Sequence, residues 1–351
     1  MTDKSDLVSK KMKIVDSLEA VNNMFYERGW TDGLPIIPPT EERVRTMLSG
    51  CRRDPQEHVA VLPPKQAVAT VEKIAINAVM AGCLPDYMPL IITAVEAIAE
   101  EKFRLMGVLT TTHPCGVLVV VNGPISRRLG INCMGNAFGP GIMANAAIGR
   151  ALSLIMLNIG GGIPGQIDKS TQGNPCKYTF CVAENEAANP WQPFHVERGF
   201  RPEDSTVTVF AAEGPHNIND HDSTTGVELL KTMTATMSTA GNNNLIFFSG
   251  EPILMLGPEH AATLAKDGFS KEQVKDFIFQ NARVPKSAIS EGHIQYRKKS
   301  PERYGQYVSS EFIPLARRED IIVMVIGGSG KHSCFIPTFG LNYSVTKLVT
   351  V

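Results

Sequence analysis

The chain lacks the cysteine patterns that hold disulfide-rich and zinc-binding proteins together. It has seven cysteines in 351 residues, an odd number, and no CxxC pair. The closest two are Cys176 and Cys181. This pattern argues against a disulfide framework and against a zinc ribbon. Most of the cysteines are therefore expected to behave as small buried hydrophobic residues.

A surplus of charge of either sign is also missing. The 34 lysine and arginine residues nearly balance the 35 aspartate and glutamate residues, which leaves a formal net charge of -1. Basic residues nowhere form a long run. Proteins that bind nucleic acid need a dense positive surface to neutralise phosphates. Nucleic acid is therefore not expected as a partner.

No segment has the pattern of a secretion signal or of a membrane span. Residues 1–21 have a polar, amphipathic helical pattern without the apolar core and cleavage site of a signal. The most apolar stretch, residues 141–162, is interrupted by Asn145, Arg150 and Asn158. Such a stretch favours a buried central helix over a membrane span. We therefore expect a cytoplasmic protein without membrane contact.

Apolar runs alternate with helical patterns along the chain, as in α/β proteins. Apolar runs that predict strands lie at residues 106–112, 116–124, 177–185, 206–214, 244–250, 252–257 and 321–328. Helical periodicity predicts helices at 66–81, 87–100, 142–158 and 259–267, one from Ser223 and a short one at the carboxyl terminus. Thr40 and Ser270 have the sequence context of N-caps, and Ser270 with Gln273 fits a capping box.

The predicted fold is α/β, with mixed or mostly parallel sheets flanked by helices. A chain of this length suits two α/β lobes, with the site at the strand carboxyl ends. We expect an N-terminal helix and extended arm in residues 1–55, a first lobe in 56–170 and a second lobe in 171–351. The glycine-rich segment 160–175 is either the boundary or an active-site loop.

An apolar run followed by Gly-Pro occurs three times, at residues 119–124, 209–215 and 254–258. Glycine lets the chain turn sharply off a strand, and proline favours the first turn of a helix. The irregular spacing excludes a solenoid repeat and leaves internal duplication open.

Histidines recur just after apolar runs. His216, His260 and His332 follow runs that end in glycine, and His113 follows the run VLTTT. Parallel strands bring their carboxyl ends to one edge of a sheet. We therefore predict that His216, His260 and His332 share a pocket, which His113 joins as a fourth candidate.

The segment GPHNINDHD at 214–222 concentrates imidazole and carboxylate groups, which suit a divalent metal ion as cofactor. We predict His216, His221 and His260 as the metal ligands. The alternative is a polar loop that caps the next helix.

The segment GGSGKHSCF at 327–335 predicts a binding loop for a carboxylate or phosphate, because glycine-rich turns expose backbone amides. The predicted substrate-binding residues are Gly327, Gly328, Ser329, Gly330 and Lys331. It is not a nucleotide P-loop, since Val325 and His332 stand where glycine and Ser or Thr are required. A purely structural turn is the alternative.

Two cysteines lie within two residues of a histidine, in THPC and HSC. An adjacent imidazole can lower a thiol pKa, so Cys115 and Cys334 are candidate nucleophiles. His113, His216 and His332 are the candidate acid–base residues. Three glutamates are further acid–base candidates: Glu184, Glu186 and Glu213.

Six strings resemble a known family: GWTDGLP (29–35), AINAVMAGCLPDYMP (75–89), TTHP (111–114), GNPCKYTFCVAENE (173–186), GPEHA (257–261) and GGSGKHSCFIPTFG (327–340). The family is bacterial, and its genes often lie beside those of small selenocysteine- or cysteine-containing proteins with a UGSC motif. The resemblance runs from about residue 20 to the carboxyl terminus. It implies an enzyme that works with a thiol or selenol partner, although this chain has no UGSC string itself.

The sequence leads to one function and two alternatives. The first is an enzyme, a lyase or hydrolase, that acts on a small polar or anionic molecule by hydrolysis or elimination, assisted by histidines and a metal. The second is a subunit of a thiol- or selenol-dependent reductase system, with a UGSC-type protein as its partner. The third is a non-catalytic protein that binds a small anion.

A homo-oligomer is also expected. The arm around Trp30, Ile36 and Ile37 carries apolar surface that it cannot bury by itself. The alternative is an arm that folds over its own domain.

Overall fold

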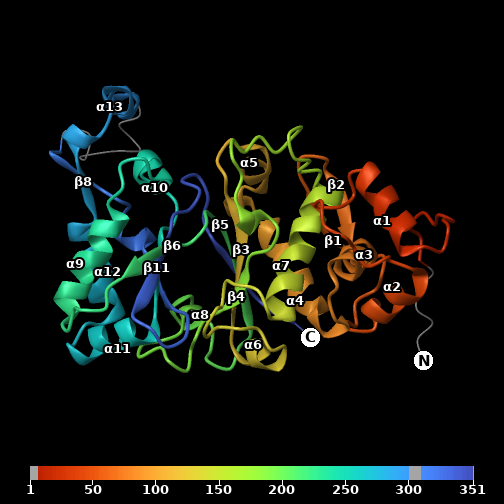
Figure 1. The fold of residues 1–351 in the computed structure, drawn as a ribbon, viewed down its shortest axis with the longest axis horizontal. Coiled ribbons are helices and arrows are strands. Elements are labelled where there is room, and N and C mark those ends of the chain that lie inside the picture. The colour runs from red at the N-terminus through yellow and green to blue at the C-terminus, as the bar shows by residue number, and fades with distance from the viewer. Residues whose placement is uncertain (1–6, 300–309, 351) are drawn as a thin grey trace.

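The computed structural model describes residues 7–299 and 310–350 of a mixed α/β protein (Figure 1). Its two central sheets contain β3 (Gly116–Asn122), β4 (Cys181–Ala183), β5 (Thr206–Ala212), β6 (His216–Asn219), β7 (Ile253–Leu256), β10 (Ile322–Val325), β11 (His332–Ile336) and β12 (Val345–Leu348). Two smaller antiparallel pairs are β1 (His58–Leu62) with β2 (Ala67–Thr70), and β8 (Arg283–Pro285) with β9 (Phe312–Pro314).

The helices lie outside these sheets. Those of the first half are α1 (Leu18–Glu27), α2 (Glu41–Leu48), α3 (Val71–Ala81), α4 (Met88–Ile98), α5 (Leu105–Thr110), α6 (Pro124–Arg128), α7 (Met143–Ile155) and α8 (Phe194–Glu197). Those of the second half are α9 (Gly226–Met237), α10 (Asn243–Phe247), α11 (Pro258–Lys266), α12 (Lys271–Asn281) and α13 (Glu291–Lys298). A π-helical turn, η3 (Met156–Gly160), continues α7.

The two central sheets have the same strand plan. In one, β3 pairs parallel with β4 and antiparallel with β5; in the other, β7 pairs parallel with β10 and antiparallel with β11. The next strand of each series then crosses to the edge of the opposite sheet, so that β6 pairs with β11 and β12 pairs with β5. Gly-Pro follows β3 and β7 at equivalent positions, where the prolines begin α6 and α11.

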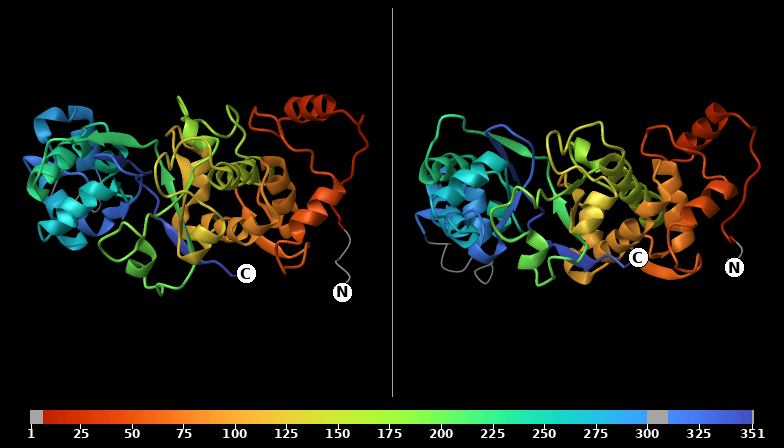
Figure 2. Two further views of the ribbon diagram at one scale, coloured as in Figure 1. Left: turned by 60° about the horizontal axis from the view of Figure 1, so that its bottom comes forward. Right: turned by 90° about the horizontal axis from the view of Figure 1, so that it is seen from below.

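The sheets pack face to face in the middle of the molecule. Leu118 and Val120 of β3 share one apolar cluster with Ile253 and Met255 of β7. The alternate residues of each strand face helices: Val119 packs in the cluster of α3, α4 and α7 and other first-half elements, and the β7 residues Leu254 and Leu256 pack with α9, α11 and α12. Because strand side chains alternate in direction, the result is four layers, helix–sheet–sheet–helix. Figure 2 shows α1 at one end of the molecule and the α9–α12 group at the other.

The crossing segments join the two sheets. Ala212 forms a bridge with Thr338, and the backbone N–H of Glu213 donates to the Pro337 carbonyl at 2.8 Å. The chain therefore passes from one sheet to the other after β5 and returns after β11. The expected boundary at residue 170 falls between strands of a single sheet, since β4, β5 and β12 pair into the sheet of β3.

Several predicted elements are confirmed, and others are wrong. Thr40 caps α2, and Ser270 with Gln273 forms the capping box of α12. The runs 106–112 and 244–250 were predicted as strands but form the helices α5 and α10. Packing outweighs the weak strand preference of these short segments. The carboxyl-terminal helix is likewise wrong, because β11 and β12 occupy that region.

The amino-terminal segment is only partly helical. Residues 1–6 lie outside the described part of the chain, and α1 begins at Leu18 behind its N-cap Ser17. The stretch Met143–Gly160 is long and apolar enough to cross a membrane by length and composition, yet 67% of it is buried inside the protein. This stretch packs against α3 and the sheet of β3. It is therefore a buried central helix, as the sequence predicted.

Candidate functional site

The structure separates His216 from the other two predicted pocket histidines. His332 begins β11 opposite Asn219, whereas His216 lies opposite Phe335. His216 and Asn219 are three residues apart on one strand, so their side chains point to opposite faces of the sheet. The prediction that His216, His260 and His332 share one pocket is therefore wrong.

His260 has a structural position. It is buried at 2% exposure, with Nδ1 2.8 Å from the Ser333 hydroxyl and Nε2 3.0 Å from the Asp220 carbonyl. Burial lowers its pKa, because the charged ring is poorly solvated there. Within the described residues no three His, Cys, Asp or Glu side chains are grouped as a metal site. The predicted centre of His216, His221 and His260 is therefore wrong.

The glycine loop at 327–330 is held by contacts within the protein. The Gly327 amide donates to the Cys133 carbonyl at 2.9 Å, and the Gly330 amide donates to the Glu259 carboxylate at 2.5 Å. Lys331 donates through Nζ to the His221 carbonyl at 2.7 Å. A carboxylate of the protein thus occupies the place expected for an anionic ligand. The remaining two predicted binding residues, Gly328 and Ser329, are half-buried and exposed.

Of the two candidate nucleophilic cysteines, Cys115 is buried and Cys334 is partly buried. Burial raises the pKa of Cys115 to about 12 and that of Cys334 to about 12. Lys177 acts against this shift at Cys115 but does not overcome it. Both thiols are therefore protonated at neutral pH, which opposes the nucleophilic role predicted for them.

A pocket of about 560 Å³ lies beside the start of β3. Its wall comes from segments that are far apart in the sequence: Asp32 in the arm, residues 108–109 of α5, residues 115–117, the end of α7 with η3, and the glycine-rich segment 162–178. Leu109, Val117 and Met156 make its apolar side. Concave sites with an apolar wall and few polar groups are the usual form of small-molecule sites.

A charged network lines the polar side of this pocket. Lys177 Nζ lies 2.5 Å from Asp168 Oδ2 and donates to the Ser170 hydroxyl at 2.6 Å. The Ser170 hydroxyl lies 2.7 Å from Asp168 Oδ1 and 3.2 Å from the His113 carbonyl. Burial opposes ionisation of Asp168, but hydrogen bonds from Lys177 and Ser170 outweigh it and lower its pKa. Asp168 therefore stays ionised beside Lys177 at neutral pH.

His113 lies next to this network and pairs with Glu213. Its Nε2 is 2.6 Å from Glu213 Oε1, and the two side chains are 10% and 30% exposed. The His113 ring stacks on Phe339 with centroids 5.5 Å apart. Its Nδ1 is buried without a hydrogen-bond partner among the described residues. Of the histidines predicted to be catalytic, His113 is the one beside the pocket network.

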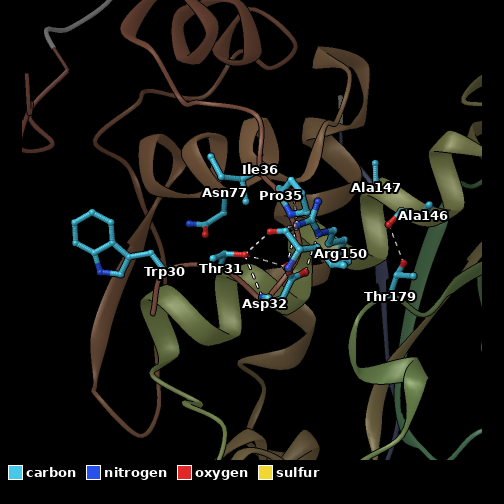
Figure 3. Close-up of polar contacts among 12 residues, drawn as sticks. Trp30, Thr31, Asp32, Pro35, Ile36, Asn77, Ala146, Ala147, Arg150 and Thr179 are labelled. Carbon is cyan, nitrogen blue, oxygen red and sulfur yellow. Dashed lines mark hydrogen bonds and ion pairs between the residues drawn. The ribbon is translucent and has the colours of Figure 1, made fainter. Parts of the chain in front are cut away.

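The arm reaches the pocket through Asp32, which Figure 3 shows beside Arg150. Arg150 of α7 donates to both Asp32 oxygens at 2.8 and 2.9 Å and to the Pro35 carbonyl at 2.9 Å. Asn158 donates to the Trp30 carbonyl at 3.1 Å. The arm is thus folded over its own chain. Ile36 is buried there and Ile37 stays 45% exposed, so the reason for expecting an oligomer applies to only part of the arm.

Glu184 and Glu186 lie elsewhere, after β4. Glu184 accepts hydrogen bonds from Asn122 Nδ2, Asn189 Nδ2 and the Phe194 amide at 2.6, 2.8 and 2.7 Å. Burial raises its pKa. These contacts fix the loop before α8, which indicates a structural role.

The sequence did not single out Asp168, Ser170 or Lys177 as site residues. A signal for Asp168 and Ser170 was present, because the glycine-rich segment 160–175 was interpreted as either a domain boundary or an active-site loop. Comparisons with protein-family models, with curated proteins and with solved structures find no match for this chain. The geometry of the pocket is therefore the basis for a function.

Proposed function

We propose that the chain is an enzyme that acts on a small polar or anionic molecule by hydrolysis or elimination, and that the pocket beside β3 is its active site. The observation that carries the proposal is the convergence of Asp32, Cys115 and the 162–178 segment on one pocket with an ordered charged network. Paired charges and a hydroxyl held on an otherwise apolar wall are expensive to build without a ligand to bind.

Lys177 and Ser170 are the proposed binding groups. Lys177 Nζ lies 2.5 Å from Asp168 Oδ2 and is the proposed cationic group of the pocket. A protonated lysine stabilises negative charge on a substrate oxygen as it develops in a transition state. Ser170, which accepts from Lys177, is positioned to hydrogen-bond the same substrate group.

His113 and Glu213 are the proposed acid–base pair. The Glu213 carboxylate, 2.6 Å from Nε2, orients the His113 ring and fixes which ring nitrogen faces away from it. Nδ1 of His113 has no partner among the described residues, so it is available for a proton once a ligand or water reaches it. A short rearrangement of the 111–114 loop would be required, since Nδ1 is buried.

This site lies where β3 begins, beside the carboxyl end of the antiparallel β5 and away from the carboxyl ends of β3 and β4. The proposed pocket belongs to the half of the molecule that is built on the sheet of β3. The reductase alternative gains no support, because the thiols of Cys115 and Cys334 have raised pKa values.

A thermal-shift screen with small carboxylates, amides and phosphorylated compounds tests binding at this pocket. Ligands that stabilise the wild type should lose their effect in Lys177→Met. Lys169→Met is the matched control, since Lys169 is on the same segment and its Nζ donates to the Gly165 carbonyl. Loss of one charge-assisted contact is worth about 1.5–3 kcal/mol, or roughly ten- to hundredfold in affinity. Equal shifts in all three proteins would contradict the pocket assignment.

A further inference from the structure

Two exposed histidines meet on the face of the second sheet, away from the residues of the pocket. His221 follows β6 and His332 begins β11, and their Nε2 atoms are 3.2 Å apart. The rings lie edge to face, with centroids 5.0 Å apart and planes at 80°. Two imidazole nitrogens directed at each other share either a proton or a metal ion.

The hydrogen bond at the other nitrogen of His332 decides what its Nε2 offers. Nδ1 of His332 lies 3.0 Å from Asn217 Oδ1. An amide oxygen only accepts, so Nδ1 carries the proton and Nε2 presents a lone pair. Histidine ligands of metals are oriented in this way, by an acceptor that holds the ring nitrogen opposite the metal.

The spacing of the two nitrogens fits a metal ion. Zinc–imidazole bonds of about 2.0–2.1 Å at a tetrahedral angle place two ligand nitrogens about 3.3–3.4 Å apart. The Nε2 atoms of His221 and His332 are 3.2 Å apart, close to this separation. We propose that His221 and His332 form a two-histidine site for a divalent transition-metal ion, with Asn217 as the positioning residue.

The chemistry of the donors selects the class of ion. Neutral imidazoles favour zinc, nickel and copper over magnesium and calcium, which prefer oxygen ligands. Within the described residues no third His, Cys, Asp or Glu side chain completes a group. Water or an external ligand therefore supplies the remaining coordination positions, and the site is open to a small molecule.

The backbone on both sides of the pair is held in place. Lys331 Nζ donates to the His221 carbonyl at 2.7 Å, and the Asp220 amide donates to the Lys331 carbonyl at 3.3 Å. The buried ring of His260 bridges the Ser333 hydroxyl and the Asp220 carbonyl, at 2.8 and 3.0 Å. Because these contacts fix the residues next to both ligands, the entropic cost of ordering the site when a metal ion binds is small. A bound ion would also fasten the loop after β6 to β11.

Metal titration of the untagged, chelator-treated full chain tests this site. Isothermal titration with Zn²⁺, and absorption of Co²⁺ in the visible range, should both report one ion per chain. His221→Asn and His332→Asn should each abolish the Co²⁺ spectrum. Asn217→Ala should weaken binding roughly ten- to hundredfold, as loss of a positioning acceptor does, whereas Asn217→Asp should retain it.

His216→Asn is the matched control, because His216 lies on β6 like Asn217 but points to the opposite face of the sheet. It should bind Zn²⁺ like the wild type. Circular dichroism without metal should be the same for all variants, which separates loss of a ligand from loss of the fold. Absence of Zn²⁺ and Co²⁺ binding in the wild type, or equal binding in His332→Asn, would overturn the proposal and leave the proposed enzyme function unaffected.

Discussion

Arg150 of α7 binds Asp32 through two hydrogen bonds of 2.8 and 2.9 Å, across 118 residues of sequence. The Arg150 and Asp32 side chains are only 16% and 12% exposed. This pair fastens the amino-terminal arm to the central helix, and Asp32 is at the same time part of the pocket wall. Folding of the arm and shape of the pocket are therefore coupled.

Asp32→Asn should destabilise the protein by about 3 kcal/mol, because it leaves the Arg150 charge largely buried without its partner. Chemical denaturation at pH 7 measures this. Arg201→Met, at an exposed ion pair on the surface, should have far less effect. A loss no larger than that of Arg201→Met would show that the arm is not held by this pair.

The same pair predicts a pH dependence. Burial opposes ionisation of Asp32, but the hydrogen bonds and charge of Arg150 outweigh it, so its pKa is lowered. A lowered pKa means that the stabilisation is present above the ordinary pKa of aspartate and is lost as pH falls through the lowered value. The difference in unfolding free energy between wild type and Asp32→Asn should therefore shrink in acid. A difference independent of pH would contradict the ion pair.

Asp320 predicts the opposite trend. Burial raises its pKa to about 7, and Oδ2 has no hydrogen-bond partner among the described residues. The folded protein holds this proton more tightly, so stability is fully present below the unfolded pKa and falls as pH rises to about 7. The rise of the Asp320 pKa from 3.8 to about 7 corresponds to a loss of up to about 4 kcal/mol in unfolding free energy between acid and pH 8.

Asp320→Asn should therefore be more stable than the wild type at pH 8 and not at pH 4. Denaturant titrations at both pH values measure the effect. Glu319→Gln, at the exposed neighbouring position, should leave the pH trend of the wild type in place. An Asp320→Asn variant that follows the wild-type curve at both pH values would disprove a raised pKa.

The thiols of Cys115 and Cys334 should resist modification. Because burial raises the pKa of Cys115 and of Cys334 to about 12, iodoacetamide at pH 8 should label neither in the folded protein. Both should react after denaturation. Peptide mass spectrometry gives the extent at each site. Rapid labelling of Cys115 in the native protein would restore the thiol-dependent alternative.

Gly257 makes the turn between β7 and α11. A Cβ there would lie 2.1 Å from the His332 carbonyl oxygen, so Gly257→Ala should cost about 1–3 kcal/mol through overpacking. Gly292→Ala is the control, since nothing lies within 4 Å of its Cβ position. Thermal unfolding of both variants measures the difference, and equal melting temperatures would contradict the close approach of β11 to this turn.

Many of the helices and strands could be predicted from local sequence patterns. The order in which the strands pair could not. The run at 116–124 and the cap at Ser270 are local signals, and β3 and the capping box confirm them. The α5 segment was predicted as a strand because a short run of apolar and β-branched residues fits a strand as well as a helix. Its buried residues, which include Val108 and Leu109, are set by contacts with distant parts of the chain. The exchange of β6 and β12 between the sheets depends on pairs far apart in sequence, which periodicity does not encode.

The site divides in the same way. His113 and Glu213 are recognisable as acid–base residue types, but their pairing across 100 residues comes only from the crossing of the chain after β5. His216 was expected to share a pocket with His332, but the strand register places the two side chains on opposite faces of the sheet. Asp168 lies in a segment without periodicity, where a sequence gives no direction for a side chain. Lys177 began the strand predicted at 177–185, but it ends the short helical turn Pro175–Lys177 ahead of β4.

The central claim is that the pocket beside β3 carries out chemistry, and untargeted mass spectrometry of a metabolite mixture incubated with the protein tests it most directly. We predict that the wild type and Lys169→Met deplete the same compound and form the same product, and that Lys177→Met and His113→Gln leave it unchanged. All four proteins should have the same circular dichroism spectrum. Turnover by Lys177→Met and His113→Gln at the wild-type rate, or no compound consumed by the wild type, would contradict the claim.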